Sequence, residues 1–198
     1  MADTFYTIST PGEGIYKEKM SKFIAFAIPA SSAAEAKSIV STYANKYHDA
    51  RHVCWAYMIG PGRDEYLSSD NGEPSGTAGK PILGQINSHN LTNIVVIVVR
   101  YFGGIKLGTS GLITAYREAA RLAIGSTEII ECHDQTVISF TFPYLAMEPV
   151  MRLVKGSDLK ILDQQFDNSC SMTISLRSDH APGLRGRLSD ISGVSILD

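Results

Sequence analysis

The 198-residue sequence lacks the features that would assign it at once to a membrane, metal or redox class. No apolar run approaches the ~20 residues that a transmembrane helix needs. Its three cysteines, Cys54, Cys132 and Cys170, form no Cys-x-x-Cys pair, and its five histidines show no zinc-ligand spacing. We therefore expect reduced thiols in a cytoplasmic protein that has no membrane association and no metal.

The chain also has no surplus of positive charge. It carries 18 Lys and Arg against 20 Asp and Glu, a net charge of −2. Residues 1–130 hold 12 basic and 11 acidic side chains, and residues 131–198 hold 6 and 9. A strong, sequence-independent nucleic-acid binder needs a large positive field, so any contact with a polyanion must be local.

Sequence motifs of common enzyme classes are missing as well. The chain contains no Walker A motif, no G-x-S-x-G and no G-x-G-x-x-G. We therefore assign no catalytic residue and no cofactor.

What the chain does have is the composition of a folded globular protein, with 44% hydrophobic and 19% charged residues. Its first part alternates strand and helix patterns, and Ser32 with Glu35 forms a capping box. The uniformly apolar run 94–99 predicts a strand that is buried on both faces. Strands are predicted at 22–28, 53–59, 65–68 and 94–99, and helices at about 31–46, 77–86 and 109–125.

The last third predicts a second domain. Its order is β-α-β-β-α-β, the ferredoxin-like pattern. Pro149 lies inside the first predicted helix, where proline is unfavourable, so we expect the helix to begin near this residue. The predicted elements are a strand at 136–142, a helix at 144–155, a hairpin of 159–166 and 171–176 around Asp167 and Asn168, a helix at 182–191 and a strand at 194–197. We expect two domains, 1–130 and 131–198, and an α+β fold class.

Two glycine-dense segments flank the apolar run. Residues 70–81 read DNGEPSGTAGKP and are called here the first glycine loop; residues 100–111 read RYFGGIKLGTSG and are called the second. Glycine loses much conformational entropy on folding, so such density needs a reason. Bare backbone N–H groups beside a helix start are often used to bind an anion.

These two loops, at this spacing, resemble the signature of the IMPACT/YigZ family. The flanking segments 22–25 and 50–57 fit the same pattern, which covers the chain to about residue 125. The remainder resembles the small ferredoxin-like domain of the bacterial YigZ branch.

The resemblance implies a fold and a field of function. The N-terminal domain should be a two-layer α/β fold like domain IV of elongation factor G and part of a small-subunit ribosomal protein. The C-terminal domain should resemble domain V of that factor. Such relatives imply contact with RNA or the ribosome, and eukaryotic IMPACT proteins regulate translation through protein partners. Fold analogy alone does not establish a function.

Within the second glycine loop, cationic and aromatic side chains are candidates for binding an anion or RNA. Arg100 and Lys106 supply N–H donors, and Tyr101 and Phe102 can stack on a base. In the alternative, Phe102 packs in the core and Arg100 pairs with Asp70 or Glu73. The candidate ligand-binding residues are Arg100, Tyr101, Lys106, Gly103, Gly104, Gly108, Thr109, Gly76, Thr77 and Gly79.

In the first glycine loop, the acidic residues are assigned a structural role. Asp70 or Glu73 accepts hydrogen bonds from loop N–H groups, since two carboxylates are too few for a hard metal ion. His52 and Cys54 share one face of a strand, and we interpret them as a satisfied histidine and a buried thiol, not as a catalytic pair. The loop-structuring residues are Asp70, Gly72, Glu73, Pro74 and Pro81.

Two functions from different classes remain open. The preferred one is a non-enzymatic cytoplasmic protein that binds RNA, the ribosome or a translation-associated protein. The alternative is an enzyme that acts on a phosphorylated small molecule or a peptide, with Asp70 or Glu73 as the base. The sequence leaves the ligand and the oligomeric state undetermined.

Overall fold

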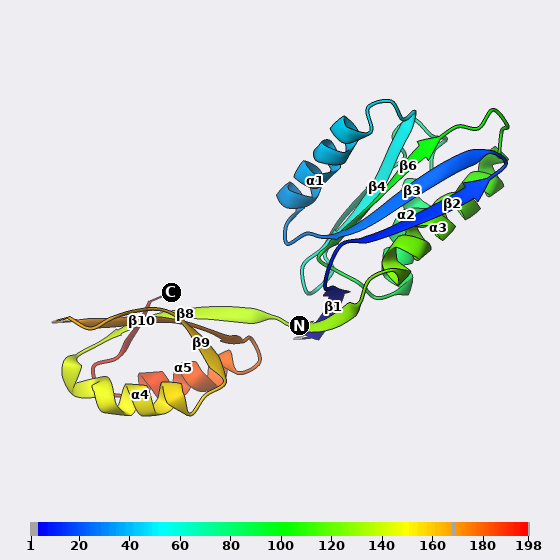
Figure 1. Cartoon of the computed structure of the whole chain (residues 1–198). Coiled ribbons are helices and arrows are strands. Elements are labelled where there is room, and N and C mark those ends of the chain that lie inside the picture. Colours follow the sequence, from blue (N-terminus) through cyan, green and yellow to red (C-terminus); the bar gives the residue numbers. More distant parts are fainter. Residues whose placement is uncertain (1–3, 168, 198) are drawn as a thin grey trace. The chain divides into compact units, whose positions relative to one another are not determined.

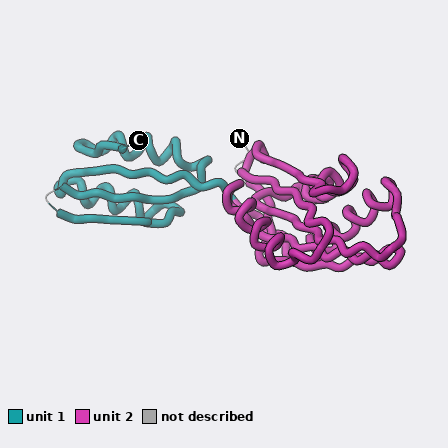
Figure 2. The backbone as a smooth tube through the Cα atoms, turned by 90° about the horizontal axis from the view of Figure 1, so that it is seen from above, with its two compact units in different colours: residues 1, 133–198 teal, residues 2–132 magenta. Residues whose placement is uncertain are grey.

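The computed structural model describes residues 4–167 and 169–197. They form two compact units, which are described separately (Figure 2). Residues 4–132, drawn in magenta, are called here the first unit, and residues 133–197, drawn in teal, the second unit. Asn168, which was predicted at a hairpin turn, lies outside the described residues.

The first unit is built on a five-stranded antiparallel sheet (Figure 1). Its order is β2-β3-β6-β4-β5, so the apolar run at 94–99 forms the central strand. As predicted, that strand is buried on both faces. The strands are β2 (Gly12–Glu18), β3 (Ser21–Pro29), β4 (His52–Ile59), β5 (Glu65–Ser69) and β6 (Ile94–Tyr101). A separate pair, β1 (Thr4–Ile8) with β7 (Ile129–His133), was not predicted.

Helices cover both faces of this sheet, which corrects the expected two-layer arrangement. α1 (Ala33–Lys46) lies on one face, and α2 (Gly79–Ser88) and α3 (Gly108–Gly125) lie on the other (Figure 1). The reason lies in β6, where Val96 and Val98 point to α2 and α3 while Val95 and Ile97 point to α1. A strand that is apolar on both sides needs cover on both sides.

The start of α1 contains the predicted cap by Ser32, with the return bond from Glu35 displaced by one residue to Ser31. Ser32 is the N-cap residue, and its hydroxyl accepts a hydrogen bond from the Glu35 N–H at 3.2 Å. The Glu35 carboxylate reaches back to accept from the Ser31 N–H at 2.7 Å. Local sequence therefore determines this helix boundary.

The second unit has the predicted element order. Alternate side chains of β8 and β10 pack against both helices of the unit in one core. Pro149 lies in the first turn of α4, where its missing N–H costs nothing, because the helix begins at Met147 and only a 3₁₀ turn precedes it. The sheet order is β11-β8-β10-β9. The elements are β8 (Gln135–Phe142), α4 (Met147–Lys155), β9 (Leu159–Gln165), β10 (Cys170–Arg177), α5 (Ala181–Ser189) and β11 (Ser195–Leu197).

None of the helices in the described ranges is long and apolar enough to span a membrane.

Candidate functional site

A cleft of about 440 Å³ lies between the two glycine loops of the first unit. Its volume falls within the range of about 300–1,000 Å³ that is usual for small-molecule sites. Both loops and the first turn of α3 contribute to its wall. The lining residues are Arg51, His52, Glu73, Pro74, Arg100, Phe102, Lys106, Leu107, Gly108, Thr109 and Leu112.

A buried ion pair joins the loops in the wall of the cleft. Arg100 Nη1 donates to Glu73 Oε1 at 2.6 Å, and the Tyr116 hydroxyl donates to the same oxygen at 2.8 Å. The Arg100 and Glu73 side chains are only 7% and 4% exposed. The alternative in which Arg100 pairs with Glu73 is thus what the structure contains. The guanidinium is therefore not free at the surface to bind phosphate. The sequence analysis, by contrast, placed Arg100 among the candidate ligand-binding residues.

The N–H groups of the first glycine loop already hold an anion that belongs to the protein. The Asp70 carboxylate accepts from the backbone N–H groups of Gly76, Ala78 and Gly79 at 2.8, 3.0 and 2.8 Å. Burial by itself would raise the pKa of Asp70, but these bonds and Lys80 outweigh it and hold that pKa below its ordinary value. The Asp70 carboxylate thus bonds within its own loop, and these N–H groups are unavailable to an external ligand.

The second glycine loop leads into the start of α3, where no side chain caps the first backbone N–H groups. The N-cap residue of α3 is Leu107, whose side chain cannot accept a hydrogen bond, so no side chain caps this 18-residue helix. Gly108, with φ of +75°, and Thr109 line the cleft at that helix start. The exposed Lys106 precedes them. The uncapped N–H groups and the helix dipole favour a negative charge at this end of the cleft.

Tyr101 does not belong to the same surface as Arg100. β6 continues through Tyr101, and successive residues of a strand point to opposite faces. Tyr101 packs on the α1 side, and its hydroxyl donates to Asp49 Oδ1 at 2.9 Å. Phe102 follows the strand, lines the cleft and is 43% exposed, so it is not a core residue.

Several other predicted ligand residues lie outside the cleft. A Cβ at Gly103 would come within 2.0 Å of the Met20 backbone, so this glycine is needed for a close approach of two chain segments. Thr77 turns inward and donates its hydroxyl hydrogen to the Pro74 carbonyl at 2.7 Å. Arg100, Lys106, Gly108 and Thr109 line the cleft, whereas Tyr101, Gly103, Gly104, Gly76, Thr77 and Gly79 do not.

The strand residues His52 and Cys54 have separate partners. His52 Nδ1 lies 2.9 Å from the Asn71 carbonyl oxygen. Cys54 Sγ donates to the Asp70 carbonyl at 3.0 Å and lies 3.3 Å from the Tyr116 hydroxyl. Burial raises the pKa of the Cys54 thiol to about 12, so it stays protonated and is no nucleophile. The expected buried thiol is confirmed.

Some cleft residues escaped the sequence reasoning. Tyr116 does not line the cleft, but it bonds to Glu73 in the cleft wall, and this bond depends on where the first glycine loop lies in space. Arg51 lies in the flanking segment 50–57, but it was not singled out as a candidate ligand-binding residue. His52 was considered and set aside, although it lines the cleft beside Glu73. In the described parts of the chain, no group of three His, Cys, Asp or Glu side chains is placed to hold a metal ion.

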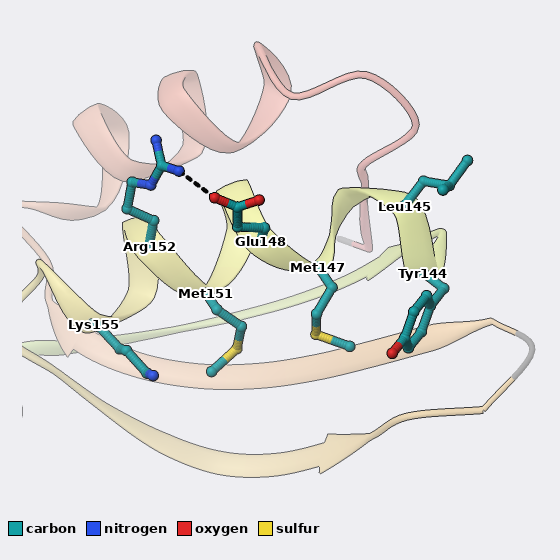
Figure 3. Close-up of a pocket in the computed structure, with 7 residues that line it drawn as sticks. All are labelled: Tyr144, Leu145, Met147, Glu148, Met151, Arg152 and Lys155. Atoms are coloured by element: carbon teal, nitrogen blue, oxygen red, sulfur yellow. Dashed lines mark hydrogen bonds and ion pairs between the residues drawn. The ribbon is translucent and has the colours of Figure 1, made fainter.

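A second hollow, of about 570 Å³, lies along α4 in the second unit (Figure 3). Met147 and Met151 project from one side of the helix, whereas Leu145 points away from them (Figure 3). Arg152 pairs with Glu148 at 2.5 Å on the exposed surface. Since these side chains do not converge on one point, we place the candidate site in the first unit.

Comparisons with known proteins match the part of the chain that contains the cleft. Residues 19–124, which include both glycine loops, match the Impact N-terminal domain family. An IMPACT family member of Haemophilus influenzae is 32% identical over 160 residues, which are 80% of this chain and 78% of the relative. IMPACT family member YigZ of Escherichia coli is 31% identical over 180 residues, which are 90% of this chain and 88% of the relative.

A solved structure also matches over the full length. It is described as the crystal structure of a hypothetical protein, and it is 28% identical in sequence with a TM-score of 0.76. The match covers 100% of this chain and 98% of the other.

Proposed function

The chain belongs to the IMPACT family, and we propose that it is a cytoplasmic, non-enzymatic regulator of translation that binds single-stranded RNA in the cleft between its glycine loops. The translation part rests on the family, whose eukaryotic members regulate translation. The RNA part rests on the cleft.

The observation that carries the proposal is the composition of the cleft lining. The uncapped start of α3 favours a phosphate group, and the exposed cations Lys106 and Arg51 lie in the same lining. The half-exposed ring of Phe102 gives a nucleobase a face on which to stack. This is a short local site, which suits a chain with net charge −2.

The same geometry argues against the enzymatic alternative. Both Asp70 oxygens accept backbone N–H groups, and Glu73 Oε1 is held by Arg100 and Tyr116. A general base needs a free oxygen within reach of the proton that it takes. Asp70 is thus committed to structure and has no free oxygen for this role, whereas Glu73 keeps only Oε2 without a hydrogen-bond donor among the described residues.

The test is fluorescence anisotropy of a labelled single-stranded RNA octamer with the full-length protein over a salt series. Lys106→Ala should weaken binding and lower the slope of log K against log salt by about 0.7, the value for one lost phosphate contact on a single strand. Phe102→Ala should weaken binding about 5- to 100-fold through the lost stacking.

The matched control is Lys37→Ala, which removes an exposed lysine of α1 on the other face of the sheet. It should leave both the affinity and the salt slope unchanged. RNA binding that is equal in the wild type, Lys106→Ala and Phe102→Ala would reject this site.

A further inference from the structure

The cleft lining contains two hydrogen-bond acceptors, Glu73 Oε2 and His52 Nε2, that no donor bridges among the described residues. Glu73 Oε2 lies 4.0 Å from His52 Nε2, too far for a direct hydrogen bond, and both residues line the cleft. The other carboxylate oxygen, Oε1, takes both bonds from Arg100 and Tyr116. Among the described residues none donates to Oε2.

The tautomer of the neutral His52 ring follows from the partner of its Nδ1 atom. Nδ1 lies 2.9 Å from the backbone carbonyl oxygen of Asn71, and a carbonyl oxygen can only accept. Nδ1 therefore carries the hydrogen, and in the neutral ring Nε2 is a bare acceptor. The His52 side chain is 12% exposed, so its ring is held in place at the cleft.

The two ends of the cleft thus differ in the kind of ligand group that they favour. At the Glu73 and His52 end, a carboxylate oxygen and a bare nitrogen repel an anion and call for a group with hydrogen-bond donors. At the α3 end, uncapped N–H groups and Lys106 favour an anion. The Glu73 side chain is itself only 4% exposed, so its Oε2 is a buried acceptor in the cleft lining.

We propose that the cleft binds a ribonucleotide with a free 2′,3′-cis-diol, as at the 3′ end of RNA. The two diol hydroxyls donate to Glu73 Oε2 and His52 Nε2, and the phosphate lies at the start of α3 beside Lys106. This inference rests on the proposed RNA binding and specifies which part of the RNA enters the cleft.

The diol is favoured because it has two adjacent donors. An internal nucleotide of RNA has a single 2′-hydroxyl, which satisfies one acceptor and leaves the other without a partner. A DNA end lacks the 2′-hydroxyl altogether. A buried acceptor that loses its water and gains no donor weakens binding, so the site discriminates against both.

The test compares probes on the unmodified full-length protein, so it does not depend on a variant that folds. Anisotropy titrations use one 5′-labelled RNA octamer with a 3′-hydroxyl, with a 3′-phosphate or with a 2′-deoxy terminal residue. We expect the 3′-hydroxyl RNA to bind about tenfold more tightly than the other two. Competition by adenosine 5′-monophosphate, compared with its 2′-deoxy form, tests whether a free nucleotide supplies the same chemistry.

Substitutions test whether the preference for the 3′-hydroxyl RNA depends on His52. His52→Ala should bring the affinity for the 3′-hydroxyl RNA down to that for the 3′-phosphate RNA, while His48→Ala, an exposed histidine, should preserve the preference.

The outcomes separate the two proposals. RNA that binds equally well with either 3′ end, and equal competition by the ribo and deoxy nucleotides, would overturn the diol inference and leave RNA binding intact. Absence of RNA binding together with preferential binding of the free ribonucleotide would reject the proposed function but support the diol site. Absence of both would reject both.

Discussion

Glu73 and Arg100 lie 27 residues apart in the sequence and form a 2.6 Å ion pair in the buried wall of the cleft. Glu73 belongs to the first glycine loop and Arg100 to the start of the second. The pair therefore ties the two loops together, and Tyr116 of α3 adds a third element through the same carboxylate oxygen.

Breaking this pair should destabilise the first unit strongly. Arg100→Met leaves the Glu73 carboxylate buried without its counter-charge, which we expect to cost about 3–5 kcal/mol. Urea unfolding can be followed by the fluorescence of Trp55, the chain's one tryptophan, which lies in β4 of this unit. The double variant Arg100→Met/Glu73→Gln should cost less than the sum of the two single variants, because they share one interaction. Additive costs would show that the pair is not coupled.

The Asp70 carboxylate should give the first unit an acid-sensitive component of stability. Its pKa in the folded protein lies below the ordinary value of 3.8, so its contribution is complete above that value and is lost as the pH falls through the lower folded pKa. Asp70→Asn should cost about 2 kcal/mol at pH 7 and should flatten the fall in stability below about pH 4. Unfolding by urea at pH values from 7 to about 2.5 measures this. An unchanged acid dependence in the variant would contradict this role.

The three thiols should differ in reactivity in the native protein. Cys54 and Cys170 are buried, and burial raises the pKa of Cys54 to about 12, whereas Cys132 is partly exposed. Iodoacetamide at pH 8 should therefore label Cys132 first, because the thiolate is the reactive form. Peptide mass spectrometry of timed samples identifies the labelled residue, and labelling in urea provides the reference for free thiols. Labelling of native Cys54 at the urea rate would contradict the buried environment.

Gly103 should tolerate no side chain. A Cβ there would lie 2.0 Å from the Met20 backbone, so the second glycine loop or the β2–β3 turn must move. We expect Gly103→Ala to cost about 2 kcal/mol or more in the Trp55-monitored unfolding. Gly125→Ala is the control, because a Cβ at Gly125 meets no atom within 4 Å. Equal stabilities of the two variants would contradict the close approach.

The elements of the fold were largely predictable from the sequence. The apolar run at 94–99, the capping box of Ser32 and Glu35 and the alternation at 136–142 each depend on residues a few positions apart. β1, β2 and β7 were missed, because these strands are largely half-exposed or exposed and have weak apolar patterns. The two-layer expectation came from the family resemblance, whereas the strand predicted to be buried on both faces already required cover on both sides of the sheet.

The sequence by itself determined the order of the elements in the second unit, the main elements of the first, the two glycine loops and the family, since all of these reside in local patterns and contiguous motifs. Only the tertiary structure decided what the loop residues do. It turned Tyr101 away from Arg100, used Asp70 to occupy the N–H groups of its own loop, paired Glu73 with Arg100 and left the start of α3 and the His52 nitrogen at the cleft. The physical reason is that hydrogen bonds and ion pairs between loops depend on which strands are neighbours in the sheet, and this arrangement is a property of the whole folded unit.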